Sequence, residues 1–302
     1  MMAGMTSTLS PAHPARGIVL VLLAAMLWGT TGTAQSLAPA GLSPYWVGAL
    51  RLALASGFFA LLAMRAGAPA RPWPWPWART LLAGACVAAY NLSFFAGVKY
   101  SGVALGTAIA IGSGPLWAGM LQALLLRRWP SAPWWLGTLV GVAGGAAMAL
   151  GQGSGLRPSL VGTLLCLLAG LSYAGYALLN KALVLQLGPA RANLAVFGSA
   201  ALLSLPLAWA FAGAPQAGAG AWAVVAYLGL VATGVAYLLF SSALRHVSGA
   251  TAVTLALAEP VTAFALAVLV VGEAPQPLAY LGLAGVIAGL LLVVWAELRA
   301  VR

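Results

Sequence analysis

Glu259 is the residue of this 302-residue chain whose position most favours chemistry, because it lies inside a long apolar stretch, directly before Pro260. The other two acidic residues, Glu273 and Glu297, lie at the ends of such stretches. A carboxyl group placed within a membrane is costly and is by default a candidate functional group. Glu259 could carry a proton, pair with a substrate ammonium, or donate a hydrogen bond that braces a bend at the proline.

Aromatic and polar residues deep inside apolar stretches are the second set of candidates. Trp28 and Tyr173 occupy equivalent positions of an internal repeat, so we expect both to face the boundary between the two copies. Such rings offer a flat apolar face and a polar group at the edge. Trp117 we assign instead to packing or to lipid. We predict a substrate site lined by Trp28, Tyr90, Asn91, Gly112, Ser113, Tyr173, Tyr176, Tyr237 and Glu259.

Two apolar stretches contain helix-breaking sequences at matching points of the repeat. These are Gly112-Ser113-Gly114-Pro115 and Ala258-Glu259-Pro260. Proline removes a backbone donor and clashes with the preceding turn, so Pro115 and Pro260 predict a kink or an opening at mid-membrane. Backbone groups freed there can bind a polar substrate where they line a cavity. The alternative is a simple curved helix.

Several kinds of chemistry are missing from the sequence. There is no aspartate and no cluster of His, Cys or acidic residues, so we predict neither an enzyme nor a metal site, and no cofactor. No deep cluster of Lys or Arg exists to hold phosphate, and no GxxxxGK[ST] loop to bind ATP. Cys86 and Cys166 are interpreted as small core residues.

The elements that must position these residues are membrane-spanning helices. The chain is 63% hydrophobic and 6% charged, which excludes a soluble fold of this length and predicts an all-α membrane protein. The long continuous apolar runs exclude a β-barrel. Ten helices are predicted near residues 17–38, 44–65, 79–98, 102–125, 132–151, 158–180, 190–212, 221–243, 249–271 and 277–297.

The chain contains an internal repeat with a fixed offset of 145 residues. Trp28 corresponds to Tyr173, Pro115 to Pro260, and Gly144 to Gly289. Because each copy holds five predicted helices, the second copy must enter the membrane from the opposite face. We therefore predict two inverted five-helix repeats, an architecture typical of secondary transporters. The predicted parts are a cytoplasmic tail (1–16), a first repeat (17–152) and a second, inverted repeat (153–302).

The distribution of basic residues predicts the orientation. The loops and tails on the side of the N-terminus carry eleven of them: Arg16, Arg65, Arg71, Arg79, Arg127, Arg128, Lys181, Arg191, Arg245, Arg299 and Arg302. The opposite side has only Lys99 and Arg157, and Arg51 lies within a helix, from which we expect it to reach the outer interface. This bias places both termini in the cytoplasm. The net charge of +11 therefore indicates contact with lipid headgroups and no nucleic-acid partner.

Glycines at helical spacing predict close helix packing. Gly137, Gly141 and Gly145 form one stripe, and Gly285 and Gly289 lie in the equivalent helix of the second copy. Such stripes let helix backbones approach closely in lipid. We favour packing within a monomer over the alternative, a homodimer face.

The chain resembles the EamA-type branch of the drug/metabolite transporter superfamily over nearly its whole length. The matching segments are Leu27-Trp28-Gly29, Ser101-Gly102, Ser248-Gly249, Pro115, Glu259-Pro260 and the stretch from Gly272 to Gly282. The resemblance implies a ten-helix transporter fold. Trp28, Tyr90 and Tyr173 resemble cavity-lining positions of YddG-like exporters of aromatic and other amino acids. Gly112 and Gly114 depart from that pattern, which has aromatic residues there, and this suggests a wider pocket.

Together these features predict a multi-pass secondary transporter of a bacterial-type inner membrane. We expect it to export amino acids or similar small zwitterionic metabolites by alternating access, without ATP. One alternative is a proton-coupled drug or metabolite exporter of the same fold. The other is an integral membrane enzyme acting on lipid, against which the missing His and Asp residues argue.

Overall fold

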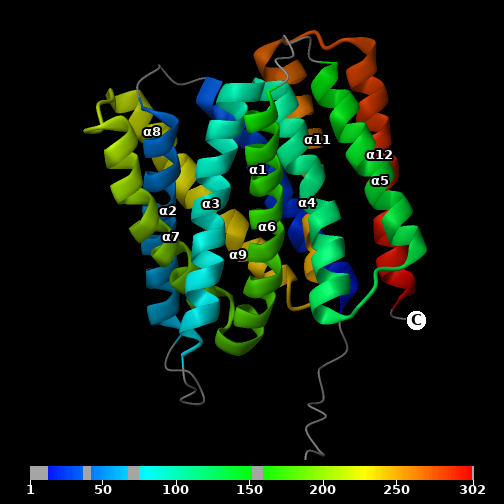
Figure 1. Cartoon of the computed structure of the whole chain (residues 1–302), viewed down its shortest axis with the longest axis horizontal. Coiled ribbons are helices and arrows are strands. Elements are labelled where there is room, and N and C mark those ends of the chain that lie inside the picture. The colour runs from blue at the N-terminus through cyan, green and yellow to red at the C-terminus, as the bar shows by residue number, and fades with distance from the viewer. Residues whose placement is uncertain (1–12, 37–41, 67–74, 152–158, 301–302) are drawn as a thin grey trace, which may run out of the picture.

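The protein is a bundle of membrane-spanning helices (Figure 1). The computed structural model describes residues 13–36, 42–66, 75–151 and 159–300. Within them, 10 helical spans are long and apolar enough to cross a membrane, which confirms the predicted fold class. Eight spans are single helices: α1 (Pro14–Ser36), α2 (Pro44–Arg65), α3 (Trp77–Ser101), α4 (Val103–Leu126), α5 (Ala132–Leu150), α6 (Leu160–Leu187), α7 (Pro189–Ala212) and α12 (Pro277–Arg299). The eighth span is made of α8 (Ala219–Tyr227), η1 (Leu228–Val235) and α9 (Ala236–Ala243), and the ninth of α10 (Gly249–Leu255), α11 (Ala258–Leu266) and η2 (Ala267–Val271).

Serine side chains mark the start of four spans. Each accepts a hydrogen bond from the backbone N–H three residues later, which satisfies a donor that the first helical turn leaves free. These residues are Ser43, Ser131, Ser159 and Ser248. The connections from α3 to α4 and from α6 to α7 need only one residue each, because Gly102 and Gly188 adopt φ values of 80° and 78°.

The two proline-containing spans differ from each other. α4 remains helical through Pro115, so the predicted opening of the helix there is wrong and the alternative of a continuous helix holds. The physical reason is support from α6: a Cβ atom on Gly170 would lie only 2.9 Å from Ala110 O and 3.1 Å from Gly114 N, so the two backbones are in close contact at this point.

The ninth span is broken, but before its proline. α10 ends at Leu255 and α11 begins at Ala258. Two tight turns bridge the gap, with Leu257 N–H donating to Thr254 O at 3.0 Å and Glu259 N–H donating to Ala256 O at 2.9 Å. Pro260 then lies in the first turn of α11, where a missing N–H removes no intrahelical bond. Glu259 is therefore presented at the start of a half-helix.

Glycines join the two repeats along α5 and α12, which lie side by side at one edge of the bundle (Figure 1). A Cβ on Gly137 would lie 2.8 Å from Gly289 O, and one on Gly282 would lie 2.6 Å from Gly144 O. Since Gly282 and Gly289 are the repeat equivalents of Gly137 and Gly144, the contact is reciprocal, as a two-fold relation requires. The close packing of this stripe lies within one chain.

The predicted glycine stripe is correct in part. Gly137 and Gly141 do face α12, but a Cβ on Gly145 would meet no atom within 4 Å. Gly144 takes its place in the contact. An α-helix has 3.6 residues per turn, so residues spaced four apart drift away from one face. The stripe therefore passes through Gly137, Gly141 and Gly144.

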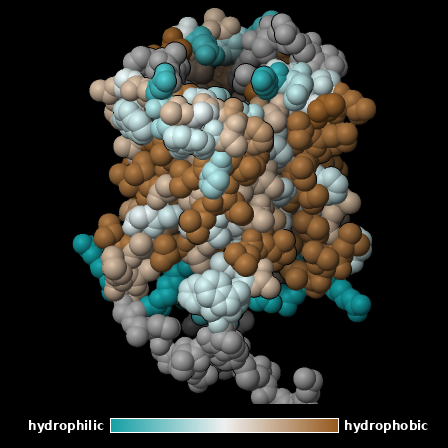
Figure 2. Space-filling view, turned by 60° about the vertical axis from the view of Figure 1, so that its left-hand side comes forward, coloured by the Kyte–Doolittle hydropathy of each residue, from teal (hydrophilic) through white to brown (hydrophobic). Residues whose placement is uncertain are grey.

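The outer surface carries a continuous apolar belt. Figure 2 shows hydrophobic residues over the middle of the molecule and hydrophilic residues gathered at its two ends. Large apolar side chains from many spans are exposed there, among them Leu61, Leu125, Leu202, Leu269 and Leu281. A belt of this kind is stable in lipid and would not be stable in water.

Candidate functional site

Five of the aromatic residues predicted from the sequence form one connected group. The Trp28 ring centroid lies 6.4 Å from Tyr173 and 4.9 Å from Tyr237. Tyr173 in turn lies 5.7 Å from Tyr90 and 6.3 Å from Tyr176. Trp28 and Tyr90 come from the first repeat and the three others from the second. The rings thus meet at the boundary between the two copies.

Phe240 contacts the same rings and was not predicted from the sequence. Its ring lies 5.5 Å from Trp28 and 6.2 Å from Tyr173. The available signal was its spacing, because a residue three positions after Tyr237 shares its helix face. We call Trp28, Tyr90, Tyr173, Tyr176, Tyr237 and Phe240 the aromatic cluster.

A buried polar network supports one side of the aromatic cluster. Asn180 donates to the Tyr176 hydroxyl at 3.0 Å and to Ser241 Oγ at 2.9 Å, and Ser241 donates to Asn193 Oδ1 at 2.6 Å. Asn193 donates to the Tyr237 carbonyl at 3.0 Å. The network links α6, α7 and α9. The Tyr176 hydroxyl already accepts a hydrogen bond from Asn180, and the Tyr176 side chain is buried. We therefore interpret Tyr176 as a structural residue that supports the other rings of the aromatic cluster.

Of the residues predicted on α4, the neighbours of Pro115 point in different directions. A Cβ on Gly112 would lie 3.2 Å from Val142 of α5, away from the aromatic cluster. Ser113 donates to Ala110 O at 3.4 Å in the contact with α6. Gly114, which was not among the predicted lining residues, faces Tyr173, because a Cβ added there would lie 3.7 Å from the Tyr173 ring. Gly112 and Ser113 are therefore corrected to packing positions, because each residue turns a helix by about 100°.

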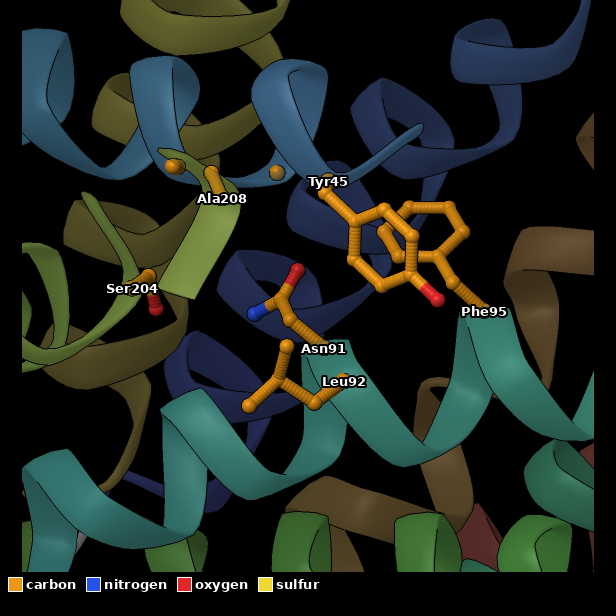
Figure 3. Close-up of a pocket in the computed structure, with 8 residues that line it drawn as sticks. Tyr45, Asn91, Leu92, Phe95, Ser204 and Ala208 are labelled. Atoms are coloured by element: carbon orange, nitrogen blue, oxygen red, sulfur yellow. The ribbon is translucent and has the colours of Figure 1, made fainter. Parts of the chain in front are cut away.

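Asn91 also lies outside the aromatic cluster. Figure 3 shows it on α3 in a small pocket between α2 and α7, opposite Ser204 and beside Tyr45. Its amide donates to Val87 O at 2.9 Å within its own helix. The pocket is lined by Tyr45, Gly48, Ala49, Asn91, Leu92, Phe95, Ser204 and Ala208. Asn91 follows Tyr90 directly in sequence. Its side chain nevertheless lines this pocket, whereas the Tyr90 ring belongs to the aromatic cluster.

Glu259 lies beside the aromatic cluster. A Cβ on Gly29, the residue after Trp28, would lie 2.7 Å from the Glu259 carbonyl oxygen, so α1 packs on the first turn of α11. The Glu259 carboxyl lies within electrostatic range of Tyr90 and Tyr173. The half-helix thus brings an acidic residue from the middle of the ninth span close to the rings at the repeat boundary.

Arg51 of α2 is a partly exposed charge that acts on residues of this region through space. Its charge is within electrostatic range of Glu259, Tyr90 and Tyr237. Its Nε atom is buried without a hydrogen-bond partner. One turn further along α2, Leu54 packs on η1 at Gly229. The expectation that Arg51 reaches the outer interface stays a prediction.

The site contains polar atoms that no described residue satisfies. Trp28 Nε1 and Tyr173 Oη are both buried and unpartnered. Unsatisfied buried donors are costly, and a cluster of them suggests a place where another molecule supplies the acceptor. Trp117, assigned to packing, also has an unpartnered Nε1, but its ring packs against the hydrophobic core.

The bundle is packed more tightly at one end than at the other. All seven residues of α10 are buried, whereas no residue of η2 is. On α1, buried positions run from Gly17 to Gly29, and none occurs from Thr30 to Ala34. At the tight end Lys181 Nζ donates to the carbonyls of Leu244 and Val247, both at 2.6 Å. The aromatic cluster is therefore closed toward the end where α1 begins.

The family model of the EamA-like transporter family matches the chain twice, over residues 15–150 and 160–295. The chain belongs to the EamA-like transporter family. It is therefore a transporter of the drug/metabolite superfamily, and not an enzyme. The two matches also show that the chain contains two copies of the family's repeat.

Individual relatives agree with this membership. The uncharacterized transporter YwfM of Bacillus subtilis (strain 168) is 40% identical over 275 residues, which cover 91% of this chain and 92% of that protein. A solved crystal structure superposes with a TM-score of 0.80 and covers 95% of this chain and 99% of that chain. Its 19% identity supports the fold alone.

Proposed function

We propose that this transporter is a secondary exporter of amino acids or similar small zwitterionic metabolites. The observation that carries the proposal is the aromatic cluster at the repeat boundary, with its unpartnered Trp28 and Tyr173 donors. Flat rings bind apolar side chains, and a few placed donors orient the polar end of a ligand. Gly114 presents no side chain of its own to the Tyr173 ring.

The mechanism we favour is alternating access by two inverted repeats, residues 17–152 and 153–302. In such transporters one repeat rocks against the other around a fixed central site. The reciprocal glycine contact between α5 and α12 supports this, because it relates the copies by a two-fold axis. The closed end of the bundle corresponds to a state in which the site is reached from the opposite face.

The proposed orientation has both termini in the cytoplasm of a bacterial-type inner membrane. α1 begins and α12 ends at the same end of the bundle (Figure 1). That end also has Arg65, Arg127, Arg191 and Arg299 at or beside helix termini, as the positive-inside rule requires of the cytoplasmic face. Under this orientation the closed end of the structure is cytoplasmic.

Transport by purified protein in liposomes tests the proposal. Labelled threonine, methionine or phenylalanine should cross the membrane without ATP, and unlabelled amino acid should compete. Empty liposomes give the background. Robust flux of another metabolite, with no flux of any amino acid, would contradict the proposed substrate class and leave the family assignment intact.

Glu259 favours a second candidate, a proton-coupled exporter of lipophilic drugs. It is the acidic residue at bilayer depth, and such residues serve as proton carriers in transporters. In that case cells expressing the protein should resist lipophilic cations, and Glu259→Gln should abolish the resistance. If expressing cells and control cells are equally sensitive to lipophilic cations, this candidate is excluded.

A further inference from the structure

We propose that the pocket beside Asn91 binds one water molecule, which bridges Asn91 of α3 and Ser204 of α7. The bridge links the first repeat to the second by hydrogen bonds. No residue of the aromatic cluster lines this pocket. The proposal is therefore independent of which substrate the protein transports.

The two polar side chains of the pocket are buried and still have hydrogen-bonding capacity. Asn91 is 8% exposed and Ser204 is 5% exposed. Among the described residues, Ser204 Oγ has no hydrogen-bond partner. The Asn91 amide nitrogen donates to Val87 O, which leaves the oxygen Oδ1 and a second N–H for another partner. Because a buried polar group without a partner is costly, a molecule that serves both side chains is favoured.

The state of the Ser204 hydroxyl differs from that of several other serines inside spans. Those serines donate to the carbonyl four residues earlier in their own helix, at distances from 2.6 to 2.9 Å; they are Ser56, Ser93, Ser199 and Ser242. Ser204 makes no such bond, and Figure 3 shows it on α7 at the edge of the pocket that Asn91 enters from α3. Its hydroxyl is therefore available to a molecule in the pocket.

The size and the lining of the pocket fit a single water molecule. Its volume is about 10 Å³, which is about the minimum that accommodates one water. An amino acid does not fit. The rest of the lining is mostly apolar and consists of Tyr45, Gly48, Ala49, Leu92, Phe95 and Ala208. Two polar side chains in such surroundings give a buried water the minimum number of partners that it needs.

The second repeat has a polar side chain at the position where the first has this space. Gly48 of α2 corresponds to Asn193 of α7 at the repeat offset of 145 residues. Asn193 extends its carboxamide to the eighth span, where it donates to Tyr237 O at 3.0 Å and accepts from Ser241 Oγ at 2.6 Å. Gly48 has no side chain, and a Cβ added there would lie 3.6 Å from Asn91 Oδ1. In the first repeat a water molecule takes over this hydrogen bonding.

A double-mutant cycle in the full-length protein tests the bridge. Ser204→Ala and Asn91→Leu should each lower the Tm in detergent by about 2–4 °C, because each removes hydrogen bonds to the water. The double variant should lose clearly less than the two shifts together, since both side chains share one water. Thr233→Val is the matched control: the Thr233 hydroxyl is also buried without a partner but does not line the pocket, so its removal should not lower the Tm.

Gly48→Ala separates a water bridge from a direct bond between the two side chains. The added methyl group occupies the space beside Asn91 Oδ1 and removes neither polar group. With the water displaced, Ser204→Ala should cost little further Tm in this background. A coupling between Asn91 and Ser204 that persists with Gly48→Ala would show a direct bond and overturn the water site.

Two further results would also overturn the proposal. One is an unchanged or raised Tm in Ser204→Ala alone, which would show that the pocket is dry and the hydroxyl unsatisfied. The other is a double variant whose Tm loss equals the sum of the single losses, which would show that Asn91 and Ser204 do not share a partner. The cycle decides between a bridge and no bridge even if Gly48→Ala does not fold.

Discussion

Tyr173 is the residue around which the candidate site is organised. Its ring contacts Trp28, Tyr90 and Phe240 from three other helices, and its hydroxyl has no partner among the described residues. Tyr176, one helical turn further on, has its hydroxyl bound to Asn180. Two tyrosines of the same helix thus have different roles, one open to a ligand and one structural.

The contrast between Trp28 and Trp117 gives a test at the residue scale. Trp28→Ala should raise the half-saturation for an aromatic substrate about threefold to tenfold, because ring stacking contributes about 0.5–1.5 kcal/mol beyond area burial. Threonine should be affected less, since it has little apolar surface. Trp117→Ala should lower expression or stability without changing the substrate ranking. Reordered selectivity in Trp117→Ala alone would show that these two indoles have been assigned to the wrong roles.

Gly114 is the residue of α4 that faces the Tyr173 ring. Gly114→Ala should be tolerated, because its Cβ would lie at an ordinary contact distance of 3.7 Å from the Tyr173 ring. Gly114→Phe should place a large ring against Tyr173 and Val253 and reduce phenylalanine transport at least about tenfold, while threonine transport falls less. Measured flux ratios of the two substrates test this, and an unchanged ratio in Gly114→Phe would place the side chain of the substrate elsewhere.

At the scale of elements, the contact between α5 and α12 is the closest approach of two spans. Lipid provides no hydrophobic drive for helix association, so backbone proximity and dispersion must hold these helices together. Their glycines allow this. At the opposite side of the site, Lys181 of α6 holds the turn after α9 through two carbonyls.

Adjacent glycines of α5 provide a matched pair of variants. Gly144→Ala should reduce stability by about 1–3 kcal/mol, because its Cβ would lie 2.7 Å from the Gly282 carbonyl and must force the helices apart. Gly145→Ala meets no atom within 4 Å and should be neutral or gain up to about 1 kcal/mol from helix propensity. Thermal unfolding in detergent measures both. Equal effects of the two substitutions would contradict the described contact.

At the scale of the whole molecule, two five-helix repeats contribute different residues to one site. The first repeat supplies Trp28 and Tyr90, and the second supplies Tyr173 and Glu259. The symmetric glycine contact is shared equally, but the charge is not, because Glu259 occurs in only one copy. The fold therefore repeats, while the candidate site is asymmetric.

The proposed orientation predicts which loops can be labelled from outside intact cells. Single cysteines at Gly41, Gly155 and Gly218 should react with an impermeant reagent, while a cysteine at Ala70 should not. Gly41, Gly155 and Ala70 lie outside the described residues. Permeabilised cells provide the control, since all four positions should then react. Protection of any of the first three in intact cells would refute the inverted topology.

The sequence by itself determined the spans, the repeat and the pairing of Trp28 with Tyr173. Apolar length and a fixed offset are properties of the chain that need no knowledge of packing. These signals predicted all ten helices within a few residues at most ends, with the largest difference at Leu187 of α6. They also predicted that aromatic residues of both copies would meet.

Only the tertiary structure decided which side chains face the site. Asn91 lies next to Tyr90 in the sequence, yet only Tyr90 belongs to the aromatic cluster. Gly112 lies near Gly114, yet only Gly114 faces the aromatic cluster. In a soluble helix, polar periodicity marks the exposed face, but a membrane span is apolar on all sides, so its sequence carries little record of which face is inward. Neighbouring helices fix that choice.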